Sequence, residues 1–517
     1  MASLAAVAGM SGVPAVVRAT DAMGLPRLGS SALARDGGVA SDDTGGQDPG
    51  GWRVEWDGEA REVGCDPNEL ISALVEANAR DGAKLKLSKG CTYSLTAYQG
   101  QDGLPVITQP IAIKGEGATI ERAASAAPFR VFNVGPGGEL TLHGVTVRGG
   151  DDRSDLGGGG LLVQSGGKAT VEDSRIVENR SATTGGGITN HGITWIVSSK
   201  DGKGGRGGMG GGDPEASVEP KDPDPSPESS GAASESGAAN GAEDGAANGA
   251  ADEAGARLDG WTDDAWSKDG WDHDTHEYVT KVNNNSAQDD GGGVYSTGFL
   301  GVDGAEVGGN NTVRDGGGLV NGGGSAVLRS AEILHNVATG LGGGVYATDG
   351  SVTKIEYSAV TDNESTADTA AGGGIFNISA ALHVRHTEVV RNGAGGFGGG
   401  IYNANGQAVI EESRISENTT RSSGGGVYNV LGNVILRKSL VDSNRANGAQ
   451  SQGAGIYTIT GSLTLTEARV SRNDSALPRG GVFASASQVT VDDRAVIVDN
   501  RPTNCVGSPV TVPNCFG

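Results

Sequence analysis

Aliphatic residues recur along this chain of 517 residues at a fixed distance from asparagine. In ten places an aliphatic residue stands three positions before an Asn. The asparagines are Asn179, Asn285, Asn310, Asn336, Asn363, Asn392, Asn418, Asn444, Asn473 and Asn500. From Asn285 onward successive members lie 25 to 29 positions apart. A fixed period in this range is typical of stacked structural repeats.

Within one period the apolar and polar positions predict three short strands. Residues 400–403, 408–411 and 415–417 are extended runs that are too short for helices and lack a helical apolar stripe. Strands of neighbouring coils stack at roughly 4.8 Å, which places like residues above like and forms parallel sheets. We therefore predict an all-β solenoid with a continuous aliphatic core. The expected core residues of this unit are Ile401, Val409, Ile410 and Ile415.

A second motif consists of three small residues followed by an aliphatic one. It occurs at residues 185–188, 291–294, 316–319, 342–345, 372–375, 398–401, 424–427 and 453–456, with variants at 158–161 and 479–482. A sharp corner repeated in every coil needs a positive φ or close backbone approach, which glycine provides cheaply. The alternative is a phosphate cradle, which needs one strand-to-helix junction followed by Lys-Ser/Thr or an acidic residue. Many tandem copies without such partners favour the corner.

The recurrent asparagines are predicted to form a ladder, in which each side-chain amide bonds its equivalent one coil away. The ladder residues are Asn285, Asn310, Asn336, Asn363, Asn392, Asn418, Asn444, Asn473 and Asn500. The alternative is that they bind a ligand. Calcium-binding nonapeptide repeats are excluded, because those need an Asp in every unit and no carboxylate recurs after these glycines.

The two motifs resemble the repeats of chlamydial polymorphic membrane proteins, although Gly usually replaces the third small residue and Ile or Val replaces Phe. The chain also resembles secreted bacterial right-handed parallel β-helix (pectin-lyase-like) repeat proteins, over about residues 64–517 apart from one insert. The resemblance implies a right-handed, single-stranded solenoid with three sheets. It implies an extracellular protein but says little about activity.

A short helix is predicted to cap the front of the solenoid, where strand edges would otherwise be exposed. Asp66 is the expected N-cap, Pro67 the first helical residue and Glu69 the reciprocal capping partner. The expected apolar stripe is Leu70, Ile71, Leu74 and Val75. Cys65, Glu69 and Ile71 resemble the spacing of the N-terminal CSLREA element found in such proteins, whose Ser-Leu-Arg is missing here.

Four cysteines fall into a front pair, Cys65 and Cys91, and a tail pair, Cys505 and Cys515. Three connectivities are possible, and sequence proximity favours the local one. The alternatives are free thiols or a metal site, but no His stands near either pair at ligand spacing. Two disulfides would indicate an oxidising compartment.

One segment interrupts the period. Asn179 and Asn285 are 106 residues apart, so about 80 residues are inserted, roughly 198–278. Residues 200–277 hold 6 basic and 19 acidic residues, a net 6 − 19 = −13, and are expected to be disordered. Their aromatic residues either dock a partner or rest on the solenoid, and the two histidines offer at most a weak metal site. These residues are Trp261, Trp266, Trp271, His273 and His276.

The expected organisation is a leader (1–60), a cap (61–105), a β-helix (106–197 and 279–500), the insert (198–278) and a C-terminal tail (501–517). The leader begins with an apolar run that reads as the remains of a secretion signal, against a disordered leader as the alternative. No run of eighteen apolar residues predicts a membrane span. The net charge of 39 − 63 = −24 argues against binding nucleic acid or anionic membranes.

No residue is assigned a catalytic, cofactor-binding or metal-binding role. Cleavage of acidic polysaccharide needs clustered carboxylates or calcium with an Arg base. Only fragments are present: Asn190-His191-Gly192, Asp289-Asp290 and Asp492-Asp493-Arg494. Glu172 and Glu411, like Arg175 and Arg414, recur with the repeats and indicate a solvated face. The favoured hypothesis is a non-enzymatic, adhesin-like or structural protein that is secreted or surface-displayed and binds a glycan or protein. The alternative is a polysaccharide lyase or glycoside hydrolase.

Overall fold

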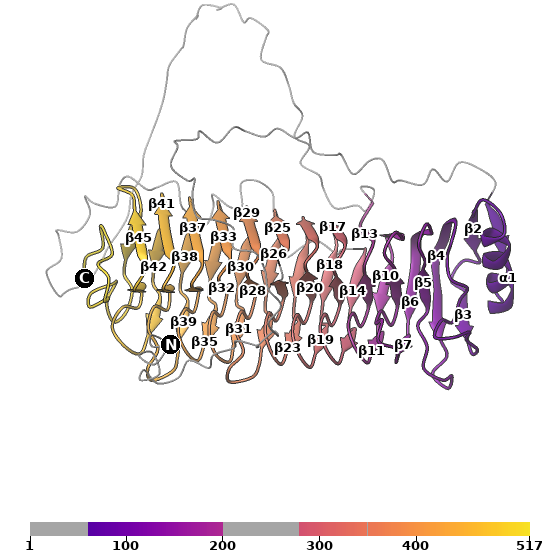
Figure 1. The fold of residues 1–517 in the computed structure, drawn as a ribbon, viewed down its shortest axis with the longest axis horizontal. Helices are drawn as coiled ribbons and strands as arrows, with labels where there is room; N and C mark the ends of the chain where they lie inside the picture. The colour runs from indigo at the N-terminus through magenta and orange to yellow at the C-terminus, as the bar shows by residue number, and fades with distance from the viewer. Residues whose placement is uncertain (1–59, 200–278, 349) are drawn as a thin grey trace, which may run out of the picture. The chain divides into compact units, whose positions relative to one another are not determined.

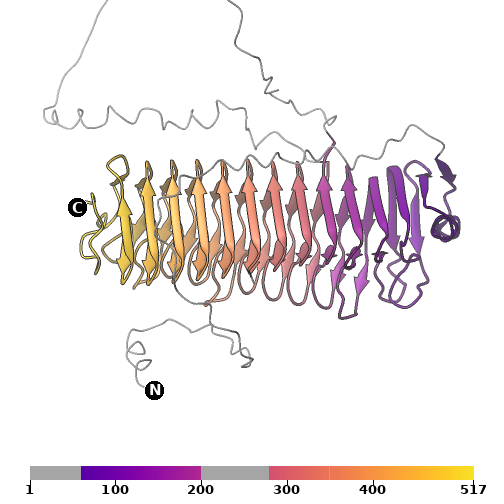
Figure 2. The same ribbon diagram turned by 45° about the horizontal axis from the view of Figure 1, so that its top comes forward.

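The computed structural model describes residues 60–199, 279–348 and 350–517. The expected leader and insert, including the three insert tryptophans and two histidines, lie outside these residues apart from positions 60, 198 and 199. The described chain is a parallel β-solenoid of about 13 turns with three sheets and one short helix, which confirms the predicted fold class. Figure 1 shows successive strands stacked in chain order from α1 toward the C-terminus, and Figure 2 shows the long strands side by side.

The largest sheet contains 25 strands. They are β1 (Arg61–Val63), β2 (Ala83–Leu87), β3 (Thr92–Leu95), β4 (Pro110–Arg122), β6 (Glu139–Arg148), β9 (Lys168–Glu172), β10 (Arg175–Val177), β13 (Ile193–Val197), β14 (Lys281–Asn283), β17 (Phe299–Asp303), β18 (Glu306–Gly308), β21 (Ser325–Arg329), β22 (Glu332–Leu334), β25 (Val352–Glu356), β26 (Ala359–Thr361), β29 (Ala381–Arg385), β30 (Glu388–Val390), β33 (Gln407–Glu411), β34 (Arg414–Ser416), β37 (Asn433–Arg437), β38 (Leu440–Asp442), β41 (Ser462–Thr466), β42 (Arg469–Ser471), β45 (Gln488–Val491) and β46 (Val496–Val498).

The second sheet contains 11 strands and the third contains 10. The second is β5 (Phe132–Val134), β8 (Leu161–Val163), β12 (Ile188–Asn190), β16 (Val294–Ser296), β20 (Leu319–Gly322), β24 (Val345–Thr348), β28 (Ile375–Ile378), β32 (Ile401–Ala404), β36 (Val427–Val430), β40 (Ile456–Ile459) and β44 (Val482–Ser485). The third is β7 (Asp151–Asp152), β11 (Arg180–Ser181), β15 (Ser286–Ala287), β19 (Asn311–Thr312), β23 (Val337–Ala338), β27 (Glu364–Ser365), β31 (Gly393–Ala394), β35 (Thr419–Thr420), β39 (Arg445–Ala446) and β43 (Asp474–Ser475).

One regular turn therefore has four strands, for example β32, β33, β34 and β35, and the prediction of three was wrong. The missed strand is only two residues long and follows the ladder asparagine. Four strands per turn still form only three sheets, because the long strands β4 and β6 continue through a corner. They thereby join two neighbouring columns of strands into the 25-stranded sheet. Like residues pair between turns, as in Ile401↔Val427, so each position forms a column.

The core consists of aliphatic columns. Ile401, Ala408, Ile410 and Ile415 are fully buried. Val409 is only partly buried and lies outside the core, contrary to the prediction, because successive strand residues point to opposite faces. The true core partner on that strand is Ala408.

The corners explain the glycine motif. Gly398 has φ +64°, and a Cβ on Gly400 would lie 2.7 Å from the carbonyl oxygen of Gly426 in the next turn. Within one glycine motif, therefore, one position requires glycine for its positive φ and another requires it for close backbone approach. The same turn also takes positive φ at Asn405, Glu412 and Glu417, where the longer side chains reach solvent at a conformational cost.

Helix α1 (Pro67–Asn78) caps the first turns, and the Asp66 side chain accepts a hydrogen bond from the backbone N–H of Asn68. The Glu69 carboxylate accepts from the N–H of Gly64 (2.9 Å) rather than from Asp66, so the reciprocal bond reaches two residues further out than predicted. Leu70 and Leu74 are buried, but Val75 is 53% exposed, and the expected stripe was wrong there. Ala73 and Ala77 complete the buried face, because the small side chains allow the helix to pack closely.

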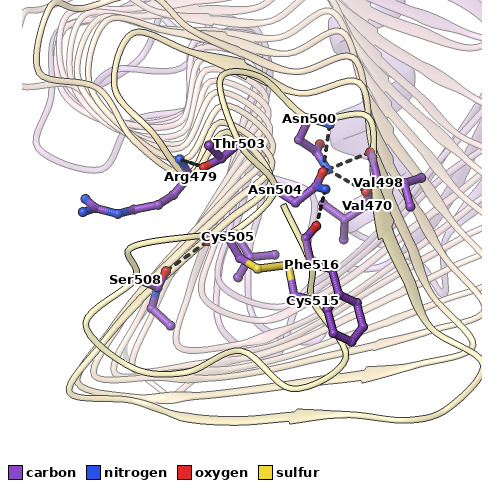
Figure 3. Close-up of a disulfide and its surroundings, with 12 residues drawn as sticks. Val470, Arg479, Val498, Asn500, Thr503, Asn504, Cys505, Ser508, Cys515 and Phe516 are labelled. Carbon is purple, nitrogen blue, oxygen red and sulfur yellow. Dashed lines mark hydrogen bonds between the residues drawn. A yellow bond between two sulfur atoms is a disulfide. The ribbon is translucent and has the colours of Figure 1, made fainter.

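Both cysteine pairs are disulfides in the structure. Cys65–Cys91 has a Cα–Cα distance of 5.8 Å and Cys505–Cys515 one of 6.3 Å. The first ties the start of the helix to the first turns, and the second closes the C-terminal tail (Figure 3).

Candidate functional site

The ladder asparagines form one buried column through the solenoid. Asn418 is typical: its Oδ1 accepts from the N–H and Nδ2 of Asn392 (2.9 and 3.0 Å). Its Nδ2 donates to Asn444 Oδ1 (3.0 Å) and to the carbonyl oxygen of Val389 (2.8 Å). The side chain is 0% exposed, so it satisfies backbone groups at a buried corner and is closed to a soluble ligand. This geometry favours a structural role for the asparagine column over ligand binding.

The column ends at a residue that the sequence pattern did not reveal. The Nδ2 and N–H of Asn500 both donate to Asn504 Oδ1 (3.0 Å each), although the two residues are only four positions apart. Asn504 Nδ2 in turn donates to the carbonyl oxygen of Phe516 (2.7 Å). Figure 3 shows Asn504 beside Asn500, with the disulfide closing the tail around it. The tail therefore supplies the rung that a further turn would have provided.

A second row of amides was also missed as a ladder. Asn377 Nδ2 donates to Asn403 Oδ1 (2.7 Å), and Asn403 Nδ2 donates to Asn429 Oδ1 (2.9 Å). The row ends at Thr458, whose hydroxyl accepts from Asn429 Nδ2 (3.1 Å). The signal was present in the sequence, because these asparagines stand two residues after the aliphatic position of the glycine motif.

An aromatic column lies on the outer side of the second sheet. Its members are Tyr346, Phe376, Tyr402, Tyr428, Tyr457 and Phe483, with neighbouring ring centroids 4.4 to 5.4 Å apart. From Phe376 to Phe483 the planes of neighbouring rings differ by only 5° to 8°. Burial raises the pKa of Tyr402 to about 12. Because the ring faces cover one another, they are not free to stack on a sugar, and the column has a structural role.

We define the long-strand face as the outward positions of β21, β25, β29, β33 and β37. Its three rows are Ser325, Val352, Ala381, Gln407 and Asn433; Val327, Lys354, His383, Val409 and Ile435; and Arg329, Glu356, Arg385, Glu411 and Arg437. The third row alternates in charge, with Arg329–Glu356 at 3.3 Å and Arg437–Glu411 at 2.7 Å. The face is partly or fully exposed and presents two mixed rows, of aliphatic and polar or basic side chains, beside one row of alternating charge.

One buried charged cluster breaks the repeat pattern near the front. Arg130 is 1% exposed and pairs with Asp102 and Asp152 at 2.8 Å each. It also donates to the carbonyl oxygens of Gly157 and Gly158. Burial raises the pKa of Asp152, although the Arg130 charge opposes that effect. With its guanidinium enclosed by protein acceptors, the cluster is suited to fixing the early turns rather than to binding substrate.

The three fragments considered as catalytic candidates each make contacts of their own in the structure. His191 Nδ1 lies 2.7 Å from Thr297 Oγ1, and burial lowers the pKa of His191. Asp290 Oδ1 lies 3.9 Å from Arg314 Nε, and burial raises the pKa of Asp290. The Asp492 carboxylate accepts a hydrogen bond from the backbone N–H of Glu467 in the preceding turn. None of these contacts joins one fragment to another.

Within the three described ranges, no helix has the length and apolar character needed to cross a bilayer. No protein-family model and no curated protein matches the chain. Among solved structures, PfbA, a surface adhesin of Streptococcus pneumoniae, is similar over 85% of this chain and 92% of its own, at 9% identity and a TM-score of 0.33. At that TM-score the likeness supports no inference about what this chain binds. The pectin-lyase-like, CSLREA and chlamydial likenesses remain resemblances of sequence.

Proposed function

We propose that this chain is a non-enzymatic, secreted or cell-surface β-helix protein, adhesin-like or structural, that binds a glycan or a surface protein. The observation that carries this proposal is the long-strand face. Its rows are held in register by the backbone of successive turns, so the face is rigid and needs no ordering on binding.

The chemistry of the face suits binding. Val327, Val409 and Ile435 are partly exposed in its middle row, which also holds Lys354 and His383, and the charged row lies beside it. Protein-binding surfaces likewise combine exposed apolar side chains with polar and charged ones. Amide and hydroxyl side chains in the first row, such as Gln407 and Asn433, offer hydrogen bonds of the kind that sugars need.

The same residues argue for binding rather than bond cleavage. Hydrolysis of a glycosidic bond needs two carboxyl groups placed about 5–10 Å apart with distinct protonation states. Glu356 and Glu411 instead alternate with arginines, at 3.3 Å from Arg329 and 2.7 Å from Arg437. Each carboxylate is engaged by an arginine of an adjacent turn, so this row presents ion pairs rather than two carboxyl groups that face a common substrate.

The two disulfides support a location outside the reducing cytosol. A direct test is secretion from the native host, followed by detection of the two disulfides by mass spectrometry with and without reductant.

The binding test compares matched charge reversals on two faces. Arg385→Glu with Arg437→Glu alters the long-strand face, and Arg180→Glu with Arg445→Glu makes the same charge change on the short strands β11 and β39. We expect the first pair to abolish binding to glycan-array or surface-protein ligands and the second to leave it intact. Equal effects of the two pairs would refute the assignment of the face. Release of reducing or unsaturated sugar ends would instead favour a lyase or hydrolase.

A further inference from the structure

Three potential metal ligands meet at one corner near the front of the solenoid. His143 lies on β6 and Glu172 ends β9, and the strand register pairs them directly. Asp173 follows with φ +45°, a left-handed conformation that turns the chain sharply. Consecutive strand residues normally point to opposite faces. The turn at Asp173 instead brings both neighbouring carboxylates to the same imidazole.

We propose that His143, Glu172 and Asp173 bind one divalent transition-metal ion, with solvent completing the coordination. His143 Nδ1 lies 3.4 Å from Glu172 Oε2 and 3.9 Å from Asp173 Oδ2, and the three ligand atoms lie within 4.8 Å of one another. Four ligands at about 2.0–2.1 Å from a tetrahedral zinc ion lie about 3.3–3.4 Å apart. Small side-chain rotations therefore close the site.

Burial makes a cation favourable at this corner. The side chain of Glu172 is 9% exposed, that of Asp173 16% and that of His143 24%. Two adjacent carboxylates removed from water need compensating positive charge. The remaining exposure of His143 leaves a route for the ion and for a water ligand.

The site also has support behind its ligands. Asp173 Oδ1 accepts from the N–H of Ser199 (2.7 Å), while Oδ2 is the oxygen nearest to His143. A carboxylate whose second oxygen is anchored in this way is oriented before the metal arrives. The mixed nitrogen and oxygen donors favour Zn²⁺, Co²⁺ or Ni²⁺ over Ca²⁺ and Mg²⁺.

A later turn provides an internal comparison. There His386 Nε2 lies 2.8 Å from Glu412 Oε2, beside a second carboxylate, Glu411. Arg437 lies 2.7 Å from Glu411 and Arg385 lies 3.6 Å from Glu412, so protein cations supply the positive charge. That turn is a control site with one histidine and two neighbouring carboxylates, as at His143, and a different predicted outcome.

The experiment uses the full chain freed of metal by a chelator. Because His273 and His276 of the insert are other candidate ligands, the parent protein carries His273→Ala and His276→Ala. Calorimetric titration with Zn²⁺ and visible absorption with Co²⁺ should give one ion per chain. His143→Ala and Glu172→Gln should each weaken binding by more than roughly 10–100-fold, the loss typical of supporting residues alone. His386→Ala should leave the affinity unchanged.

Four results would overturn the proposal: no binding by the parent protein, unchanged affinity in both variants, an equal loss in His386→Ala, or competition by Ca²⁺ at equal concentration. Circular dichroism and thermal melts check folding. If His143→Ala does not fold, Glu172→Gln and Asp173→Asn, which keep side-chain volume, decide the matter. The proposal stands or falls independently of ligand binding at the long-strand face.

Discussion

Removing one rung of the asparagine column tests whether the column holds the stack together. The chosen change is Asn418→Ala, at a fully buried side chain in the middle of a run of rungs. The variant keeps its own N–H, which donates to Asn444 Oδ1 (3.0 Å). It loses the acceptor for the N–H of Asn392 and one acceptor for Asn392 Nδ2. It also loses the donor to the carbonyl oxygen of Val389 and one of the two donors to Asn444 Oδ1.

The magnitude follows from those losses. A buried backbone N–H without a partner costs about 1–3 kcal/mol, and each group that keeps another partner costs about 0.5–1.5 kcal/mol. Asn392 Nδ2 belongs to the second kind, since it still donates to the carbonyl oxygen of Val360 (2.8 Å). A total of about 3 kcal/mol is therefore expected, which corresponds to a factor of about 100 in a local opening equilibrium.

Native-state hydrogen exchange is the appropriate assay, because each turn touches only its neighbours and global unfolding need not be two-state. The amides near Asn392 should exchange about 100-fold faster in Asn418→Ala, while amides several turns away keep their rates. The matched control is Asn311→Ala, at an exposed strand position, which should change stability by less than about 0.5 kcal/mol. Similar exchange in the two variants would refute the structural role of the column.

Three further predictions use the same repeats. Gly400→Ala should lower the free energy of unfolding by more than about 2 kcal/mol in denaturant unfolding, because its Cβ would lie 2.7 Å from a carbonyl oxygen. The control is Gly117→Ala, whose Cβ would meet no atom within 4 Å. It should lower the free energy of unfolding by only about 1 kcal/mol, the cost of a positive φ at alanine. Leu431→Asn should stabilise by about 0.5–1 kcal/mol in thermal unfolding, because Leu431 is 61% exposed at φ +59° and Asn tolerates that conformation. Burial alone would raise the pKa of Asp442, but hydrogen bonds from Arg472 and two hydroxyls lower it overall. The Asp442 carboxylate therefore stabilises the fold above its unfolded pKa of about 4, and this contribution is lost as the pH falls below that value. Asp442→Asn should therefore flatten the acid branch of a stability-versus-pH curve, and an unchanged branch would contradict this reading.

The period alone was enough to predict the solenoid, because ten copies of one pattern must occupy equivalent positions. Ile401 and Asn418 belong to columns whose spacing is visible in the sequence, and both are fully buried. Val409 shows where this reasoning fails. Its neighbour Ala408 is the smaller and less hydrophobic residue, yet the phase of the strand turns Ala408 inward and Val409 outward.

Features that depend on exact geometry escaped the sequence. The short strand β35 contains two threonines with no apolar alternation, so its pairing follows only from the position of its neighbours. Asn504 breaks the spacing rule and joins the column because the closed tail folds back on the last turn. Glu69 bonds Gly64 because the chain before the helix folds over its first turn.

Repetition also hides the residues that carry unique chemistry. Glu172 and Glu411 occupy equivalent positions and look alike in sequence, and both were interpreted as part of a solvated face. Their surroundings differ, because Arg437 lies 2.7 Å from Glu411 while His143 lies 3.4 Å from Glu172. His143 and Glu172 are 29 residues apart, and only the register of β6 against β9 brings them together. In a solenoid, therefore, a functional centre is best sought where the neighbour of a repeated residue changes, even though the residue itself does not.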